Sequence, residues 1–141
     1  MPRQLTVVVL ALALVVSACG GESADKKAQK SVCSARANIK KQVDELKSTT
    51  ISTASVDGVK ANLKSIRDNL AQMTKAQKDL KGKRKQQVQS ANQAFKTEVS
   101  GVARQLGKSV TLSAGADQIK TALQSLATGY QSALAPIDCP A

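Results

Sequence analysis

Proline occurs only near the two ends of this 141-residue chain, at Pro2, Pro136 and Pro140. Because proline breaks helices, the proline-free interior, which is rich in Ala, Lys, Gln, Leu and Ser, can form long ones. Apolar residues in this interior recur at steps of three and four, the spacing of one face of a helix. The chain has one Phe, one Tyr and no Trp, so its core would consist of small and aliphatic side chains. We therefore expect an all-α fold.

Four segments carry an apolar stripe, and we expect helices over about 27–48, 55–80, 84–106 and 113–135. Ser55 should cap the second helix, Gly107 should follow the third, and Pro136 should end the fourth. The second helix has the most regular stripe, made of Val59, Leu63, Ile66, Leu70, Met73 and Leu80. Because each helix has a single stripe to bury, four stripes facing inward predict an up-down four-helix bundle.

The segment 81–87 separates the second and third helices in this interpretation. It contains no apolar side chain, and the heptad register slips across it, because the position seven residues after Leu80 is Gln87. A turn around Gly82 explains both features. The alternative is one continuous helix over 55–106, about 78 Å long at 1.5 Å per residue.

The chain also matches itself at an offset of 60 residues. Six positions of the second helix correspond to six of the fourth: Asp57, Val59, Lys60, Leu63, Ser65 and Ile66 with Asp117, Ile119, Lys120, Leu123, Ser125 and Leu126. At the same offset Ile39 meets Val99 and Leu46 meets Leu106. The domain is thus either a duplicated αα-hairpin or a pair of heptad patterns aligned by chance.

The first eighteen residues have the layout of a secretory signal. Arg3 precedes the apolar run 5–16, which is too short to cross a bilayer, because a spanning helix needs about 20 residues. The run ends at Val16, and two small residues and a cysteine follow it: Ser17, Ala18 and Cys19. Together these four residues form a box. This box resembles the lipobox of bacterial lipoproteins. The composition of the remainder is similar to that of small uncharacterised lipoproteins of high-GC Gram-positive bacteria.

The resemblance implies cleavage after Ala18 and a diacylglyceryl thioether on Cys19, with fatty acyl chains such as palmitate. Two or more such chains anchor a protein stably to a membrane. The chain would then divide into a signal peptide at 1–18, the lipidated cysteine with a polar tether at 19–30, and a helical domain at 31–141, with the tether able to turn helical near Asp25. The location would be the cell envelope, on the outer face of the cell membrane, or at the outer membrane of a Gram-negative cell. The alternative is an ordinary cleaved signal followed by an unmodified cysteine.

Lipidation of Cys19 would leave Cys33 and Cys139 as an even pair. The compartment outside the cytoplasm permits disulfides, and an up-down bundle places the start of its first helix near the end of its fourth. We therefore expect a Cys33–Cys139 disulfide, which contributes about 4–5 kcal/mol in the chain-entropy model for a loop of roughly 100 residues. Free thiols are the alternative. A metal site is disfavoured because the chain has no His and no closely spaced cysteine pair.

The net charge of +11 favours anionic partners such as membrane lipids or cell-wall polymers. Nucleic-acid binding usually adds aromatic stacking platforms, and two aromatic residues are too few. A basic cluster surrounds the predicted turn: Lys75, Lys78, Lys81, Lys83, Arg84 and Lys85. In the bundle this cluster, called the basic turn below, would lie at the lipid end and contact anionic headgroups. The alternative is a solvated basic loop.

Catalysis finds little support in the sequence. The absence of His excludes Ser-His and Cys-His nucleophile systems, and there is no glycine-rich phosphate loop. We expect no enzymatic activity, no cofactor and no metal. Two functions remain: a rigid lipid-anchored module that presents a face to an envelope protein or polymer, or a small-ligand carrier with a cavity between helices. The alanine-rich stripes allow close packing and favour the first.

Overall fold

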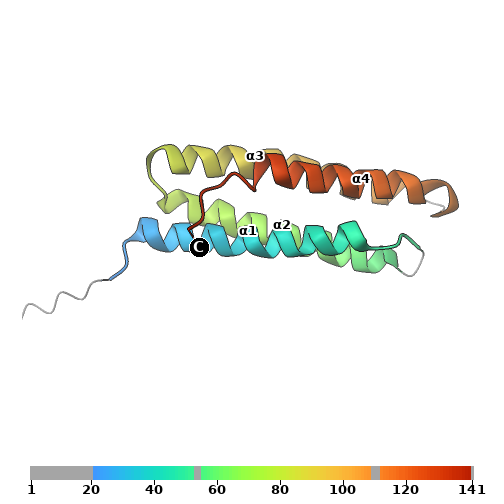
Figure 1. Ribbon diagram of the computed structural model, residues 1–141, viewed down its shortest axis with the longest axis horizontal. Helices are drawn as coiled ribbons and strands as arrows, with labels where there is room; N and C mark the ends of the chain where they lie inside the picture. The colour runs from blue at the N-terminus through green and yellow to red at the C-terminus, as the bar shows by residue number, and fades with distance from the viewer. Residues whose placement is uncertain (1–20, 53–54, 109–111, 141) are drawn as a thin grey trace, which may run out of the picture.

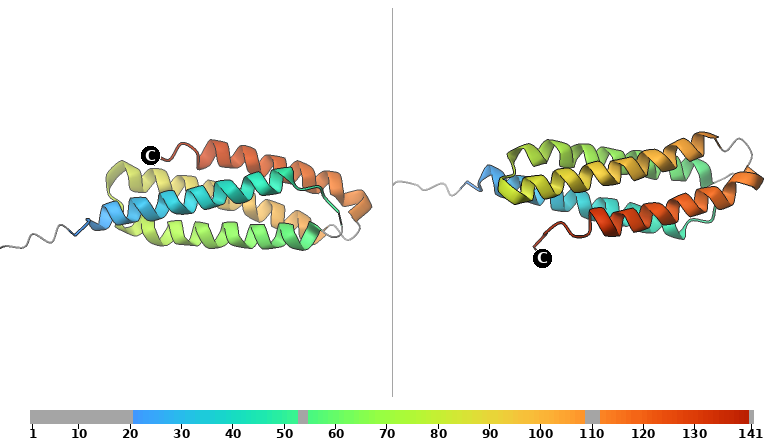
Figure 2. Two further views of the ribbon diagram at one scale, coloured as in Figure 1. Left: turned by 60° about the horizontal axis from the view of Figure 1, so that its bottom comes forward. Right: turned by 90° about the horizontal axis from the view of Figure 1, so that it is seen from above.

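The computed structural model describes residues 21–52, 55–108 and 112–140, with only the backbone for 112–114. These residues form an all-α, up-down bundle (Figures 1 and 2). Its elements are four α-helices and a short 3₁₀ helix: α1 (Ala24–Ser48), α2 (Val56–Ala76), η2 (Gln77–Asp79), α3 (Gly82–Lys108) and α4 (Leu112–Ala133). The predicted fold class is confirmed.

The four apolar stripes meet in one continuous core. Helix α1 packs mainly on α2 and α3 mainly on α4, so the bundle consists of two hairpins laid against each other (Figure 1). Every member of the predicted α2 stripe is buried, as are Phe95 on α3 and Tyr130 on α4. Among the described residues, the buried apolar side chains lie between Ala28 and Ile137, so residues 20–141 contain the core that the structure describes.

The α2–α3 connection is a turn, which excludes the single long helix among the alternatives. Helix α2 tightens into η2, Leu80 takes an extended conformation, and α3 begins at Gly82. Gly82 has φ +57°, a conformation that side chains with a Cβ rarely adopt. Leu80 remains buried at 3% exposure and closes this end of the core.

Two predicted helix-end roles were wrong. Ser55 precedes α2, but its hydroxyl bonds to the backbone of Ser52 and gives no capping bond to the helix. Gly107 does not end α3, which continues to Lys108, and Gly82 is the only glycine of the described residues with positive φ. At Ser55 a local hydrogen bond with Ser52 overrode the capping preference seen in the sequence.

The predicted tether 19–30 extends too far. Helix α1 begins at Ala24, because the Ser23 hydroxyl accepts a hydrogen bond from the backbone nitrogen of Lys26 and caps the helix. Ala28 is already part of the core. Of the predicted tether, residues 24–30 therefore belong to the bundle.

The C-terminal tail leaves α4 near Pro136 and crosses to α1 (Figure 1). Cys139 and Cys33 form a disulfide with a Cα–Cα distance of 5.6 Å, as predicted. The guanidinium of Arg36 donates from Nη1 to the carbonyl oxygens of Ala135, at 3.0 Å, and Ile137, at 2.7 Å. The Ile137 side chain is buried, so the tail is part of the core and not a loose end.

The burial pattern repeats at the offset of 60. Five buried α1 residues, Ala28, Val32, Ala35, Ile39 and Leu46, correspond to buried α3 residues, namely Val88, Asn92, Phe95, Val99 and Leu106. Four buried α2 residues, Val59, Leu63, Ile66 and Leu70, correspond to Ile119, Leu123, Leu126 and Tyr130. The two hairpins therefore use equivalent positions for the core, as a duplication would require.

Candidate functional site

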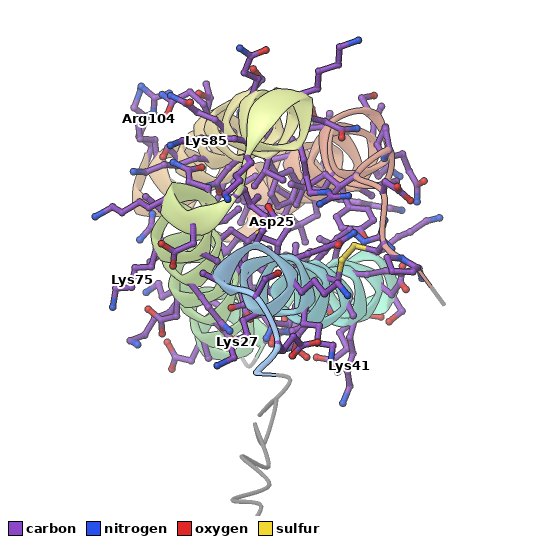
Figure 3. The ribbon with its side chains drawn as sticks, turned by 90° about the vertical axis from the view of Figure 1, so that its left-hand side faces the viewer. Asp25, Lys27, Lys41, Lys75, Lys85 and Arg104 are labelled. Carbon is purple, nitrogen blue, oxygen red and sulfur yellow. A yellow bond between two sulfur atoms is a disulfide. The ribbon has the colours of Figure 1, made fainter. Side chains whose placement is uncertain are left out.

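The basic turn lies at the end of the bundle where α1 begins. Figure 3 looks at this end and shows Asp25 of α1 near the centre, between Lys85 of α3 above and Lys27 of α1 below, with Lys75 of α2 at the side. The ammonium-bearing residues of the basic turn are exposed, while Arg84 is partly covered. Antiparallel packing brings these segments together, because α2 ends where α1 starts.

Asp25 connects the two segments. Its Oδ1 accepts a hydrogen bond from the backbone nitrogen of Lys81 at 3.1 Å, and its Oδ2 lies 3.2 Å from Nη1 of Arg84. The carboxylate also sits in the first turn of α1, where negative charge is favourable. The first turn of α1 is thus bonded directly to the basic turn, a contact that the sequence analysis missed because the partners are more than 50 residues apart.

The remaining charges at this end are mostly positive. Segments 22–30 and 75–85 contain nine basic and three acidic side chains, a net charge of +6. Glu22 pairs with Lys30 at 2.6 Å, and the hydrogen bond from Lys30 lowers the pKa of Glu22. The ammonium of Lys85 lies 3.5 Å from the carbonyl oxygen of Lys78, which holds it over the turn. The structure therefore gathers on one end a basic surface drawn from two parts of the sequence.

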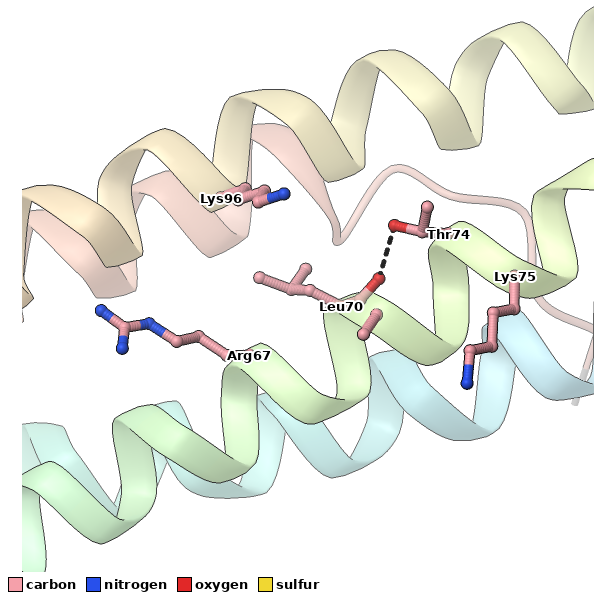
Figure 4. Close-up of a pocket in the computed structure, with 6 residues that line it drawn as sticks. Arg67, Leu70, Thr74, Lys75 and Lys96 are labelled. Atoms are coloured by element: carbon pink, nitrogen blue, oxygen red, sulfur yellow. Dashed lines mark hydrogen bonds between the residues drawn. The ribbon is translucent and has the colours of Figure 1, made fainter.

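A groove of about 270 Å³ runs between α2 and α3 (Figure 4). Leu70, Ala71 and Thr74 of α2 line it, and three cations border it: Arg67 and Lys75 from α2 and Lys96 from α3. Lys75 is the one member of the basic turn that also belongs to this groove. The sequence analysis did not identify Arg67 or Lys96, because single basic residues on a polar helix face carry no distinguishing pattern.

Asn92 of α3 is the one buried polar residue among those described, with 5% exposure. Its amide nitrogen donates to the Leu70 carbonyl oxygen at 3.2 Å and to the Thr74 hydroxyl at 2.7 Å. Thr74 in turn donates to the same carbonyl at 2.9 Å (Figure 4). These bonds tie α3 to two of the residues that line the groove and fix their positions.

The predicted signal-cleavage and lipidation site cannot be placed in the bundle, because it precedes the first described residue. Val16, Ser17, Ala18 and Cys19 lie outside the described residues. None of the helices described combines the length and the apolar character that crossing a bilayer requires. Within residues 21–52, 55–108 and 112–140, no three His, Cys, Asp or Glu side chains gather as a metal site would need.

Comparisons with protein-family models, with curated proteins and with solved structures found no match. Function is therefore inferred from the arrangement of the residues themselves.

Proposed function

We propose that the protein is a lipid-anchored module of the cell envelope, held to the membrane through Cys19, whose basic end rests on anionic headgroups. The observation that carries this proposal is the bonding of Asp25 to Lys81 and Arg84. It fixes the basic turn to the helix that leads from the anchor. The remainder of the bundle would then project outward and present its sides to an envelope protein or polymer.

The connection between anchor and bundle is short. Four residues separate Cys19 from the start of α1 at Ala24, so the five residue steps span at most about 17 Å when fully extended. The basic end is the part of the bundle nearest the attachment point. Lipidation there would hold it within roughly one or two Debye lengths of the surface, where charge attraction still acts.

The charge of this end is large enough to matter. Each Lys or Arg near an anionic leaflet contributes about 1 kcal/mol. A net charge of +6 on segments 22–30 and 75–85 would therefore orient the bundle even though no single contact is strong. The anchor supplies retention at the membrane, and the basic end supplies orientation.

Vesicle co-sedimentation tests the proposal on residues 20–141, which lack the acyl chains but contain every core residue of the described part of the chain. Binding should be strong to vesicles containing anionic lipid, weak to neutral vesicles, and reduced by salt. The variant Lys83→Gln/Lys85→Gln should bind anionic vesicles about tenfold or more weakly, because two charges are removed from the contacting end.

The matched control is Lys47→Gln/Lys60→Gln, which removes the same charge from exposed positions at the opposite end, where α1 stops and α2 begins. It should bind almost as well as the parent. Equal losses in the two double variants would show that the bundle has no preferred orientation. Equal binding of the parent to neutral and anionic vesicles would overturn the proposal altogether. Metabolic labelling of the full chain with palmitate tests the anchor, and Cys19→Ser should abolish the label.

A further inference from the structure

The two hairpins meet along two equivalent helix–helix interfaces, α2 with α3 and α4 with α1, which are called seams below. Side chains and the C-terminal tail fill only one of these seams. The 60-residue offset relates the α2–α3 seam to the α4–α1 seam, so Leu70 corresponds to Tyr130 and Lys96 corresponds to Arg36. The two seams start from the same helix geometry. Differences between them are therefore informative about what each seam can hold.

The α4–α1 seam is filled by the protein itself. Tyr130 of α4 reaches α1 at this seam, where its hydroxyl donates to the carbonyl oxygen of Arg36 at 3.4 Å, and its buried ring also contacts Phe95 of α3. The tail then covers the seam with the buried Ile137 side chain, and Arg36 binds two carbonyl oxygens of the tail. At this seam the apolar side chain of Ile137 fills the space, and the cationic Arg36 binds carbonyl oxygens of the same tail segment.

The α2–α3 seam has no such filling. Leu70 is smaller than Tyr130, and the chain after α2 turns into α3 instead of crossing the seam. The result is the groove of about 270 Å³. In the described part of the chain, the side chains of Arg67, Lys75 and Lys96 have no ion-pair or hydrogen-bond partner.

We propose that the α2–α3 groove binds a small amphiphilic anion, with an apolar body on Leu70, Ala71 and the Thr74 methyl group and a carboxylate or phosphate held by Arg67 and Lys96. The filled seam shows the same chemistry: an apolar group beside oxygen acceptors held by a cation. Three cations without a neighbouring partner give the groove the opposite charge to such a head group. At roughly 30 Å³ for each water molecule, the groove has the volume of about nine waters. A medium-length acyl chain with its head group is of similar size.

Titration followed by NMR chemical shifts tests this site on residues 20–141 with the disulfide intact. The probes are octanoate and octyl phosphate, kept monomeric, with octanol as the neutral comparison. Octanoate or octyl phosphate should shift the amides of Leu70, Thr74 and Lys96, and octanol should bind at least about tenfold more weakly, because it lacks the charge. A preference between the two anions would identify the head group.

Variants separate this groove from the membrane-facing end. Arg67→Gln/Lys96→Gln should weaken anion binding about tenfold or more, and Ala71→Phe should block it by occupying the space while keeping every charge. Lys47→Gln/Lys60→Gln, with equal charge loss at the far end, should change it less than about twofold. Circular dichroism shows whether each variant is folded.

Any of the following results would overturn the proposal: no shifts around the groove, equal binding of octanol, or full binding by both Arg67→Gln/Lys96→Gln and Ala71→Phe. Loss of octanoate binding in Lys83→Gln/Lys85→Gln alone would assign the anion to the basic turn and would also overturn it. Lys83→Gln/Lys85→Gln tests the membrane contact, whereas Arg67→Gln/Lys96→Gln and Ala71→Phe test anion binding in the groove. The two proposals can therefore fail independently of each other.

Discussion

The carboxylate of Asp25 lies 3.2 Å from the guanidinium of Arg84, which bonds the first turn of α1 to the first turn of α3. The same carboxylate accepts a hydrogen bond from the backbone of Lys81. Asp25 therefore has two opposed effects at this end of the bundle. It fixes the position of the basic turn, and it cancels one of the positive charges there.

Replacing Asp25 with Asn separates these two effects. The Asn side-chain oxygen can still accept from Lys81, so the turn should stay in place, while the net charge of this end rises by one. Binding to anionic vesicles should strengthen about fivefold, since one charge near such a surface contributes about 1 kcal/mol. Stability should fall by less than about 1 kcal/mol, because the ion pair is partly exposed.

The matched control for that measurement is Asp44→Asn. Asp44 pairs with Lys40 on an exposed part of α1, away from the basic turn, so its loss should leave vesicle binding nearly unchanged. Unchanged or weaker vesicle binding by Asp25→Asn would contradict the proposed orientation, because a positive charge added at the end that contacts the anionic surface must strengthen binding.

Gly82 supplies the turn that separates α2 from α3. At φ +57° a Cβ is strained even though no atom lies within 4 Å of its position. Gly82→Ala should therefore lower the free energy of unfolding by about 1–2 kcal/mol. Gly101→Ala is the control: it is helical, with open space at the Cβ position, and should raise the free energy of unfolding by about 0.5–1 kcal/mol.

Urea unfolding followed by circular dichroism compares the two variants. Opposite shifts of the midpoint are expected. A neutral Gly82→Ala would mean that the turn adjusts to a conformation without positive φ, and the helix boundary at this position would then be loosely specified.

The stripes predicted the core because burial in a bundle follows the helical period. Residues such as Ile66, Phe95 and Leu126 are buried because the helical period places them on the inward face of their helices. This placement does not depend on which residues they contact. The turn at Gly82 was also predictable, because both the register slip and the missing apolar residues mark it. These features depend on sequence neighbours within one or two helical turns.

Apart from the Cys33–Cys139 disulfide, features that depend on distant partners were not predicted. Asn92 reads as a polar surface residue, yet it is buried because Leu70 and Thr74 of another helix accept its hydrogen bonds. Ile137 reads as part of a short tail, yet it enters the core because Arg36 holds its carbonyl oxygen. The groove has no signature in any single helix, since it arises where one seam lacks the filling that the other has.

The Cys33–Cys139 disulfide closes a loop with a sequence separation of 106 residues. Constraining so long a loop in the unfolded chain is worth up to about 4–5 kcal/mol, and usually less is realised. Cys33→Ala/Cys139→Ala should therefore lower the free energy of unfolding by about 2–4 kcal/mol in urea titrations, while the helical content before unfolding stays the same. The parent treated with a reductant should give the same value, and an unchanged midpoint in both would show that the bridge adds no stability.

Burial raises the pKa of Tyr130, an effect that the positive charges of Arg36 and Lys40 partly oppose. Because the folded protein then holds this phenolic proton more tightly than the unfolded chain does, the contribution to stability is full below pH 10, the ordinary pKa, and is lost as the pH rises through the higher folded value.

Tyr130→Phe removes the titrating group and keeps the ring that contacts Phe95. Near neutral pH the variant should be less stable than the parent by less than about 1 kcal/mol, since only a long hydrogen bond to the Arg36 carbonyl, at 3.4 Å, is lost. As the pH rises through 10 toward the higher folded pKa, the difference should shrink and then reverse, because ionisation of the tyrosine destabilises only the parent. Parallel stability curves for the two proteins across that range would show that Tyr130 ionises as freely in the folded bundle as in the unfolded chain.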